Sequence, residues 1–365
     1  MFTLAANHQV EQPLLRHTHR RSLRREWLEL RMLCRPGIGL AAIAPRVCRL
    51  AREIVGAEAA SLFWLDENAM PLGFFHEDSP EEARFLFVNE FERLFVGEGE
   101  INVFALAQAR GRSCGHLLTP PASYFRSNTY NLLVRPSGHH HCLDLRIDDP
   151  CGGQAVLLLF RGDNPAFNDD QVAALAAFEP FLRRAGTSGR AQWRSQIANS
   201  GHLLFDPATG LICAMSDTAE TMLRDSNMVG QGLDLGGRLE SAPRFLTSLY
   251  QPLVESGEAA ACIDVPAGRL SVKATLLRSR ESQDQVLATL NYETPSEIAL
   301  IDPVLAKRLS PLRSEMLLFA AAGGARDAVS DALDISKEAT KKHLAEIYRV
   351  MDVKRWDDLA EALWR

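Results

Sequence analysis

Apolar residues recur from about residue 40 onward with two alternating spacings, one typical of helices and the other of strands. Apolar side chains three and four positions apart lie on one face of a helix. The first such stripe is formed by Ile43, Val47, Leu50, Ala51 and Ile54. Gly56 ends it, and residues 59–66 and 72–76 then predict two strands joined by a turn at 68–71. The start of this region is therefore mixed α/β.

The same alternation continues to about residue 186. The expected elements are a helix at 81–94, strands at 140–147 and 154–160, and a helix from about 169 to 184. The segment 167–170, which contains Asn168, supplies the cap of the last helix. This order predicts an antiparallel sheet with flanking helices over residues 37–186.

A second α+β segment is expected over residues 187–300, after a Gly-Thr-Ser-Gly linker at 186–189. Its expected elements are strands at 201–205, 211–215, 259–265, 270–277 and 285–292, with a helix at 217–223. The first two strands are joined by the turn Asp206–Gly210. Each strand alternates apolar and polar positions or is largely apolar, so a second sheet is predicted.

The chain ends in short helices, which predict an all-α domain over residues 301–365. Ser310 before Pro311 marks a helix start, and Gly323 with Gly324 ends that helix. Its expected core stripe is Leu312, Met316, Phe319 and Ala320. A second helix is expected at about 325–333, with Ala328, Val329 and Ala332 buried.

A third helix should begin after Ser336, which can cap it. Its core face is predicted from the spacing of Thr340, Leu344, Ile347 and Met351. The opposite face then carries Lys337, Lys341 and Lys342. Lysines in the first turns of such a helix can reach base edges or phosphates when the helix lies in a major groove.

The N-terminal segment 1–36 is predicted to be a basic leader helix or arm. Trp27, Leu28, Leu30 and Leu33 lie among seven arginines in residues 16–35. An amphipathic basic helix could contact phosphates or acidic lipid. More often such a segment packs its apolar residues on its own domain or on a dimer mate, and that interpretation is the one we prefer.

Composition limits the function classes. The formal net charge is −6, which argues against a protein that coats nucleic acid indiscriminately. No apolar run reaches the eighteen or so residues of a membrane span, so we expect a cytoplasmic protein without membrane association. Seven dispersed cysteines without a C-x-x-C pair indicate neither a disulfide framework nor a zinc knuckle.

The C-terminal helices resemble the LuxR-type, also called FixJ or NarL-type, DNA-binding domain. The positions that carry the resemblance are Leu309, Ser310, Pro311, Glu315, Gly323, Ile335, Ser336, Lys341, His343, Ile347 and Val353. The sequence departs from the family where Ala339-Thr340 replaces a threonine–valine pair and where Leu312-Arg313 replaces an arginine–glutamate pair. The resemblance implies a helix-turn-helix that binds double-stranded DNA. The implied DNA-binding residues are Lys337, Thr340, Lys341, Lys342, His343, Lys354 and Arg355.

The two upstream segments resemble sensor domains. Residues 37–186 are similar in pattern to a GAF domain, and the turn Asp206–Gly210 between two strands resembles the opening of a PAS domain. GAF domains often bind small molecules on one face of their sheet. The resemblances imply a small-molecule effector whose identity the sequence does not give.

Other motifs suggest metal or catalytic chemistry. The run His139 to Cys142 has ligand residue types for a metal or haem, but neighbours in a strand point to opposite faces and cannot all converge on one ion. The run Cys114 to His116 offers a nucleophile and a base without an orienting acid. We therefore predict no catalytic residue, no metal and no cofactor.

The sequence thus predicts a one-component transcription regulator with α+β sensor domains and a C-terminal helix-turn-helix. It would act as a homodimer, with RNA polymerase as a further candidate partner. Two alternatives remain: a protein-interaction regulator that contacts RNA polymerase without reading DNA, and a haem or redox sensor. A gel shift with promoter DNA separates the first from the prediction, and an absorbance spectrum tests the second.

Overall fold

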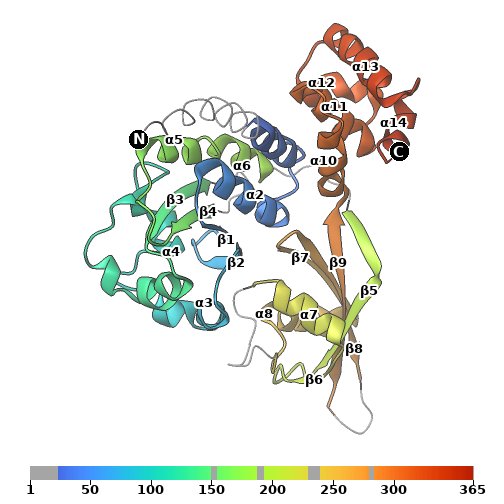
Figure 1. The fold of residues 1–365 in the computed structure, drawn as a ribbon. Helices are drawn as coiled ribbons and strands as arrows, with labels where there is room; N and C mark the ends of the chain where they lie inside the picture. Colours follow the sequence, from blue (N-terminus) through green and yellow to red (C-terminus); the bar gives the residue numbers. More distant parts are fainter. Residues whose placement is uncertain (1–23, 149–153, 187–192, 229–238, 279–282, 365) are drawn as a thin grey trace, which may run out of the picture. The chain divides into compact units, whose positions relative to one another are not determined.

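The computed structural model describes residues 24–148, 154–186, 193–228, 239–278 and 283–364 (Figure 1). The chain divides into two compact units, one of residues 1–35 with 297–365 and the other of residues 36–296. The larger unit contains two antiparallel sheets with helices, which agrees with the expected α+β content. Among the described residues, no helix is both long enough and apolar enough to cross a membrane.

The first sheet has the strand order β2-β1-β4-β3. Its strands are β1 (Ala59–Leu65), β2 (Pro71–His76), β3 (His141–Asp148) and β4 (Gln154–Arg161). Residues 155–160 of β4 are all buried, because helices cover both faces of the sheet. The helices on one face are α2 (Leu40–Val55), α5 (Asp169–Ala176) and α6 (Glu179–Ala185).

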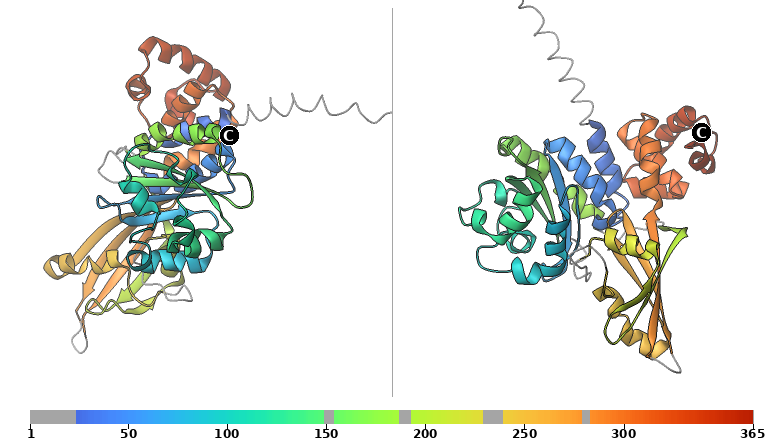
Figure 2. Two further views of the ribbon diagram at one scale, coloured as in Figure 1. Left: turned by 90° about the vertical axis from the view of Figure 1, so that its left-hand side faces the viewer. Right: turned by 60° about the horizontal axis from the view of Figure 1, so that its bottom comes forward.

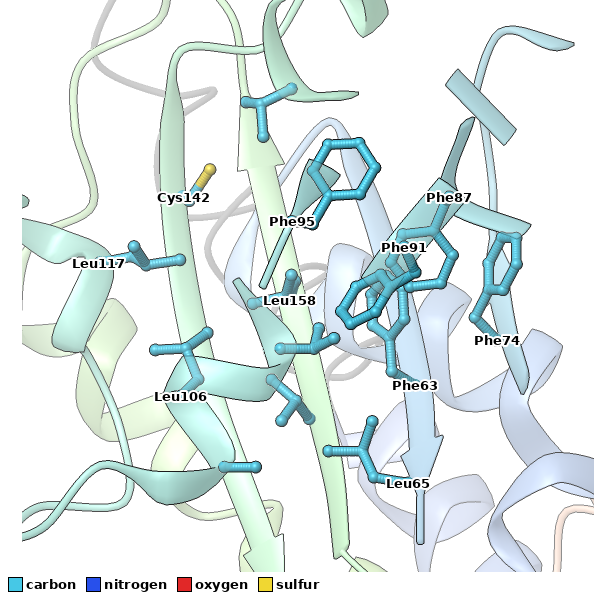
Figure 3. Close-up of a cluster of buried hydrophobic side chains, with 14 of the residues drawn as sticks. Phe63, Leu65, Phe74, Phe87, Phe91, Phe95, Leu106, Leu117, Cys142 and Leu158 are labelled. Atoms are coloured by element: carbon cyan, nitrogen blue, oxygen red, sulfur yellow. The ribbon is translucent and has the colours of Figure 1, made fainter. Parts of the chain in front are cut away.

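An aromatic cluster fills the other face, beneath α3 (Glu81–Leu94) and beside α4 (Val103–Gln108). Figure 3 shows the rings of Phe63 on β1 and Phe74 on β2 gathered with Phe87 and Phe91 of α3. The Phe74 and Phe87 ring centroids are 4.9 Å apart, and those of Phe87 and Phe91 are 5.0 Å apart. These edge-to-face contacts fix α3 on the sheet, since aromatic pairs favour such geometry.

The second sheet has the order β6-β5-β9-β8-β7. Its strands are β5 (Trp193–Phe205), β6 (Ile212–Met215), β7 (Glu258–Val265), β8 (Gly268–Leu277) and β9 (Gln285–Pro295). Helix α7 (Asp217–Asp225) lies against one face of this sheet, as Figures 1 and 2 both show. Gly201 permits the contact, because a Cβ there would come within 2.6 Å of the Ala219 Cα. Two further helices, α8 (Arg244–Thr247) and α9 (Tyr250–Ser256), complete this half.

The smaller unit is helical in the described residues. It contains residues 24–34, α10 (Ser296–Ala306), α11 (Pro311–Ala321), α12 (Val329–Leu333), α13 (Lys337–Met351) and α14 (Leu359–Ala362). Gly323, at a φ of 84°, follows α11 in the left-handed conformation that glycine tolerates best. Ser336 caps α13 by accepting a hydrogen bond of 3.1 Å from the Ala339 N–H, as predicted. Thr340, Leu344, Ile347 and Met351 are buried, so the predicted core face of α13 is confirmed.

Several predicted elements differ from the structure. The helix expected at 169–184 is two helices, α5 and α6, because Pro180 lacks the N–H that a continuous helix needs and instead lies in the first turn of α6. Ser310 makes no side-chain cap bond, although α11 begins where predicted. The expected stripe of α11 is also partly wrong: Leu312 and Phe319 are half-buried, whereas Ser314 and Glu315 are buried. The helix expected from residue 325 begins as a 3-10 turn at Arg326–Ala328.

Candidate functional site

A cavity lies within the aromatic face of the first sheet. The empty volume between its lining atoms, with the mouth included, is about 640 Å³. Its lining is mainly apolar, with Phe63, Phe74, Phe87 and Phe160 among the walls. Figure 3 shows Cys142 and Leu158, two further lining residues, on the strands of the same sheet. Its mainly apolar lining with a few polar groups is typical of small-molecule sites.

One end of the cavity is polar because His76 and His139 line it. Together with Asp78, which contacts both, they are here called the imidazole–carboxylate cluster. The Asp78 Oδ1 lies 3.2 Å from Nε2 of His139 and 3.3 Å from Nδ1 of His76. Both imidazoles stack on Phe160, with ring centroids 5.3 Å away for His76 and 5.0 Å for His139. His139 and His76 are both in the cavity lining. The cluster therefore presents the imidazoles of His76 and His139 to a mainly apolar space, while the Asp78 carboxylate that contacts both is 45% exposed.

Burial lowers the pKa of His76 to about 4, because an apolar environment disfavours the imidazolium, and the nearby Asp78 carboxylate offsets only part of this effect. Burial by itself would raise the pKa of Asp78, but the hydrogen bond from His139 and the charges of both imidazoles lower it. Near neutral pH the cluster therefore contains a neutral His76 and an ionised Asp78.

This arrangement predicts that acid destabilises the larger unit. The unfolded chain takes up a proton at His76 at a higher pH than the folded chain does, so the free energy of unfolding should fall as the pH decreases from about 6.5 to about 4. We expect a His76 contribution of up to about 3 kcal/mol. Urea unfolding across this pH range should show a shallower slope for His76→Phe. The exposed His202 is the control, since His202→Phe should retain the wild-type slope.

The side chains of the run His139 to His141 point in different directions, as expected for neighbours in a strand. His139 faces Asp78, whereas His140 Nδ1 lies 2.7 Å from the Tyr130 hydroxyl. In the described part of the chain, no group of three or more His, Cys, Asp or Glu residues is placed to hold a metal ion. The sequence interpretation missed His76 and Asp78, which are more than sixty residues before His139. No local signal joins them; the sheet topology brings them together.

The cysteine–histidine pair at 114–116 also separates. The Cys114 thiol is buried beside the Val172 carbonyl, and burial raises its pKa to about 12. His116 is directed elsewhere, with Nε2 at 2.7 Å from the Arg112 carbonyl oxygen. A thiol with this pKa is protonated near neutral pH and is a poor nucleophile.

A second candidate site is the surface of α13. Lys337, Lys341 and Lys342 are exposed on α13. Lys342 lies on the side opposite the buried residues, whereas Lys337 and Lys341, each three positions before a buried residue, lie beside the core face. Within the described ranges, these three side chains form no ion pair, whereas Arg349 is paired with Glu346 at 2.6 Å. Their charges are thus available to an anionic partner, and the N-terminal end of the helix adds positive potential.

The remaining residues predicted to bind DNA lie in different environments. Thr340, which the resemblance assigned to DNA binding, is buried and faces the core. Its hydroxyl donates to the Ser336 carbonyl at 3.0 Å. His343 is half-buried. Lys354 and Arg355 are exposed beyond α13, and Arg355 is held by Asp358 at 2.8 Å. The exposed surface is therefore Lys337, Lys341, Lys342 and Lys354, with a partly neutralised Arg355.

No family model matches the chain, and no curated protein matches it. Among solved structures, the sensor region of a sensor histidine kinase matches 38% of this chain and 59% of its own length, with 11% identity and a TM-score of 0.20. VqmA bound to DPO matches 45% of this chain and 80% of its own, with 12% identity and a TM-score of 0.18. A second structure, of the Vibrio cholerae VqmA dimer in the absence of target DNA, matches 45% of this chain and 81% of its own, with 12% identity and a TM-score of 0.17. These values are too low for the likenesses to bear on function.

Proposed function

We propose that the protein is a ligand-responsive transcription regulator that binds double-stranded DNA through its C-terminal helices. The observation that carries this proposal is the set of exposed lysines on α13, a helix whose core face is fully buried. Lysines in the first turns of a helix suit a major groove, where they can donate to guanine or to phosphates. In this proposal α12 and α13 form a LuxR-type helix-turn-helix, and α13 is the recognition helix.

The turn between α12 and α13 supports this assignment. Asp334 ends α12 in a left-handed conformation with a φ of 53°, and Ser336 caps α13 two residues later. A turn this short holds the two helices in a fixed relation, which a helix-turn-helix requires. The sequence from Leu309 onward has nine basic and ten acidic residues. Affinity for DNA should therefore depend on a homodimer that places two recognition helices on two half-sites.

The larger unit supplies the sensory half of the proposal. We assign its first half to a GAF-like domain, on the basis of its helix-covered antiparallel sheet and buried cavity. We assign its second half to a PAS-like domain. There, Asp206 Oδ1 accepts the Ala208 N–H at 2.8 Å and Gly210 has a φ of 74°, which together form the tight turn between the first two strands. The proposed regulator is cytoplasmic and non-enzymatic, responds to a small-molecule effector, and has RNA polymerase as a further partner.

The test is DNA binding by the full-length protein. Genomic fragments captured by the wild-type protein would be labelled and titrated by fluorescence anisotropy at fixed salt. Lys341→Ala should weaken binding to the captured site by about 1–3 kcal/mol, while Lys354→Ala should weaken binding to all sequences alike and make the salt dependence shallower. Lys273→Ala, at an exposed lysine on β8, is the matched control and should change nothing.

Two results would contradict the DNA-binding role. One is the capture of no fragment by folded protein, and the other is wild-type affinity in both the Lys341 and Lys354 variants. Either would favour the alternative in which these helices contact RNA polymerase or another regulator without reading DNA.

A further inference from the structure

We propose that the cavity of the first sheet binds a small, mainly apolar aromatic molecule that donates one hydrogen bond, from an N–H or O–H group, to Nδ1 of His139. This inference rests on the proposed sensory role of the larger unit. It goes beyond that role by stating which chemical feature of the effector is recognised and by which atom.

The hydrogen bonds of the imidazole–carboxylate cluster determine the tautomer of His139. The Asp78 carboxylate can only accept, so the 3.2 Å contact places the proton of His139 on Nε2. Nδ1 of His76 lies 3.3 Å from both the backbone nitrogen and Oδ1 of Asp78, but it does not displace His139, because a carboxylate oxygen can accept two hydrogen bonds. In the neutral imidazole, Nδ1 of His139 then carries a lone pair and acts as an acceptor.

Nδ1 of His139 is buried and has no hydrogen-bond partner among the described residues. The His139 side chain is only 4% exposed, so bulk water does not satisfy this atom. A buried acceptor without a donor costs free energy, and native structures rarely leave one unsatisfied unless a ligand or an ordered water completes it. Because His139 also lines the cavity, a molecule bound there could supply the missing donor.

The other polar side chains of the lining already have partners. Asn102 donates to the Phe95 carbonyl at 2.6 Å and accepts from the Phe104 N–H at 3.0 Å. The Thr129 hydroxyl donates to Glu100 at 2.6 Å. Among the described lining residues, the other unpartnered buried polar atom is Nε of Arg84, which is a donor. The buried polar atom left unsatisfied at the histidine end is therefore Nδ1 of His139, which calls for a donor on the ligand.

The aromatic lining residues of the cavity indicate the shape and polarity of the rest of the ligand. Phe63, Phe74 and Phe87 form one wall, and Phe160, on which both imidazoles stack, forms another. Flat aromatic molecules gain most from such surroundings, since they can stack on or meet the edges of these rings. A carboxylate at the histidine end would be opposed by the ionised Asp78, which disfavours anionic ligands there.

Three flat probes of similar size separate the requirements. Indole has one N–H donor and no acceptor, 1-methylindole has neither, and quinoline has one acceptor and no donor. Isothermal titration calorimetry on the wild-type full-length protein should show indole binding about 10-fold more tightly than 1-methylindole, the factor expected from one buried hydrogen bond. Quinoline should bind no better than 1-methylindole.

A variant then locates the acceptor. His139→Phe keeps a ring that can stack on Phe160 but removes Nδ1, so it should bind indole and 1-methylindole equally. The matched control is His141→Phe, at a half-buried position on β3 outside the cavity lining, which should retain the 10-fold preference. Circular dichroism would verify that both variants are folded.

Three outcomes would overturn the inference. Equal affinity for indole and 1-methylindole in the wild-type protein would show that no acceptor in the cavity forms a hydrogen bond with the ligand N–H. Tighter binding of quinoline than of indole would show that a protein donor such as Arg84, and not an acceptor, binds the polar group of the ligand. Absence of binding by all three probes would show that the cavity is not a site for molecules of this class.

The comparison of probes needs no variant, so a variant that fails to fold does not affect it. It also uses no DNA, so its failure is distinguishable from failure of the DNA-binding proposal.

Discussion

Replacing Glu315 with alanine should destabilise the smaller unit by about 1–3 kcal/mol, because it removes a buried carboxylate that pairs with two arginines. The Glu315 side chain is 1% exposed on α11, and its carboxylate contacts the guanidinium groups of Arg31 and Arg35. Arg35 also donates to the Ala332 carbonyl at 2.9 Å, at the end of α12. The N-terminal helix, residues 24–34, and the turn that follows it are thus joined to the C-terminal helices.

Hydrogen exchange would measure this effect locally, as faster exchange of the α11 amides in Glu315→Ala. The matched control is Glu346→Ala, which removes a more exposed carboxylate paired with Arg349 and should cost about 0–1 kcal/mol. Equal exchange in the two variants would mean that the carboxylate of Glu315 does not hold the N-terminal helix in place.

Phe91→Ala should destabilise the first half of the larger unit by about 3–5 kcal/mol. Phe91 is 2% exposed and contacts Phe87 and Phe95 within the aromatic cluster, so the truncation leaves a void that close-packed neighbours cannot fill. Urea unfolding of the full-length protein, with near-ultraviolet circular dichroism as the signal, would measure the change.

Phe125→Ala is the control for this truncation, because Phe125 is 37% exposed and loses less buried area. It should cost clearly less than Phe91→Ala, about 1 kcal/mol or below. Comparable losses in both variants would show that the cluster is loosely packed. In that case the cavity beside it would not be a preformed site.

Local patterns predicted most elements well where a strong start or stop signal accompanied the periodicity. The helix at Glu81–Leu94 has the predicted bounds, and Asn168 makes the predicted cap through a capping box with Gln171. The pattern failed where a single residue overrode the periodicity around it. Pro180 divided a predicted helix, and Glu315, a charged residue, took a core position on α11 that periodicity would give to an apolar side chain.

The sequence was also informative about the surface of α13. Once the core positions at Thr340, Leu344 and Ile347 are recognised, the lysines fall outside the buried face, and they are exposed in the structure. The sequence assigned Thr340 two roles, a core position from its spacing and a DNA contact from the family resemblance, and the structure buries it on the core face.

The sequence by itself determined most of the helices and strands, the α+β content and the lysines of α13, because these depend on interactions within a few residues along the chain. Only the tertiary structure decided which distant residues meet. The imidazole–carboxylate cluster joins His76 and Asp78 to His139, and the carboxylate of Glu315 joins two helices at opposite ends of the chain. The physical reason is that such pairs depend on strand order and helix packing, which bring together side chains separated by tens or hundreds of residues. No periodicity over a few turns or strands encodes that proximity.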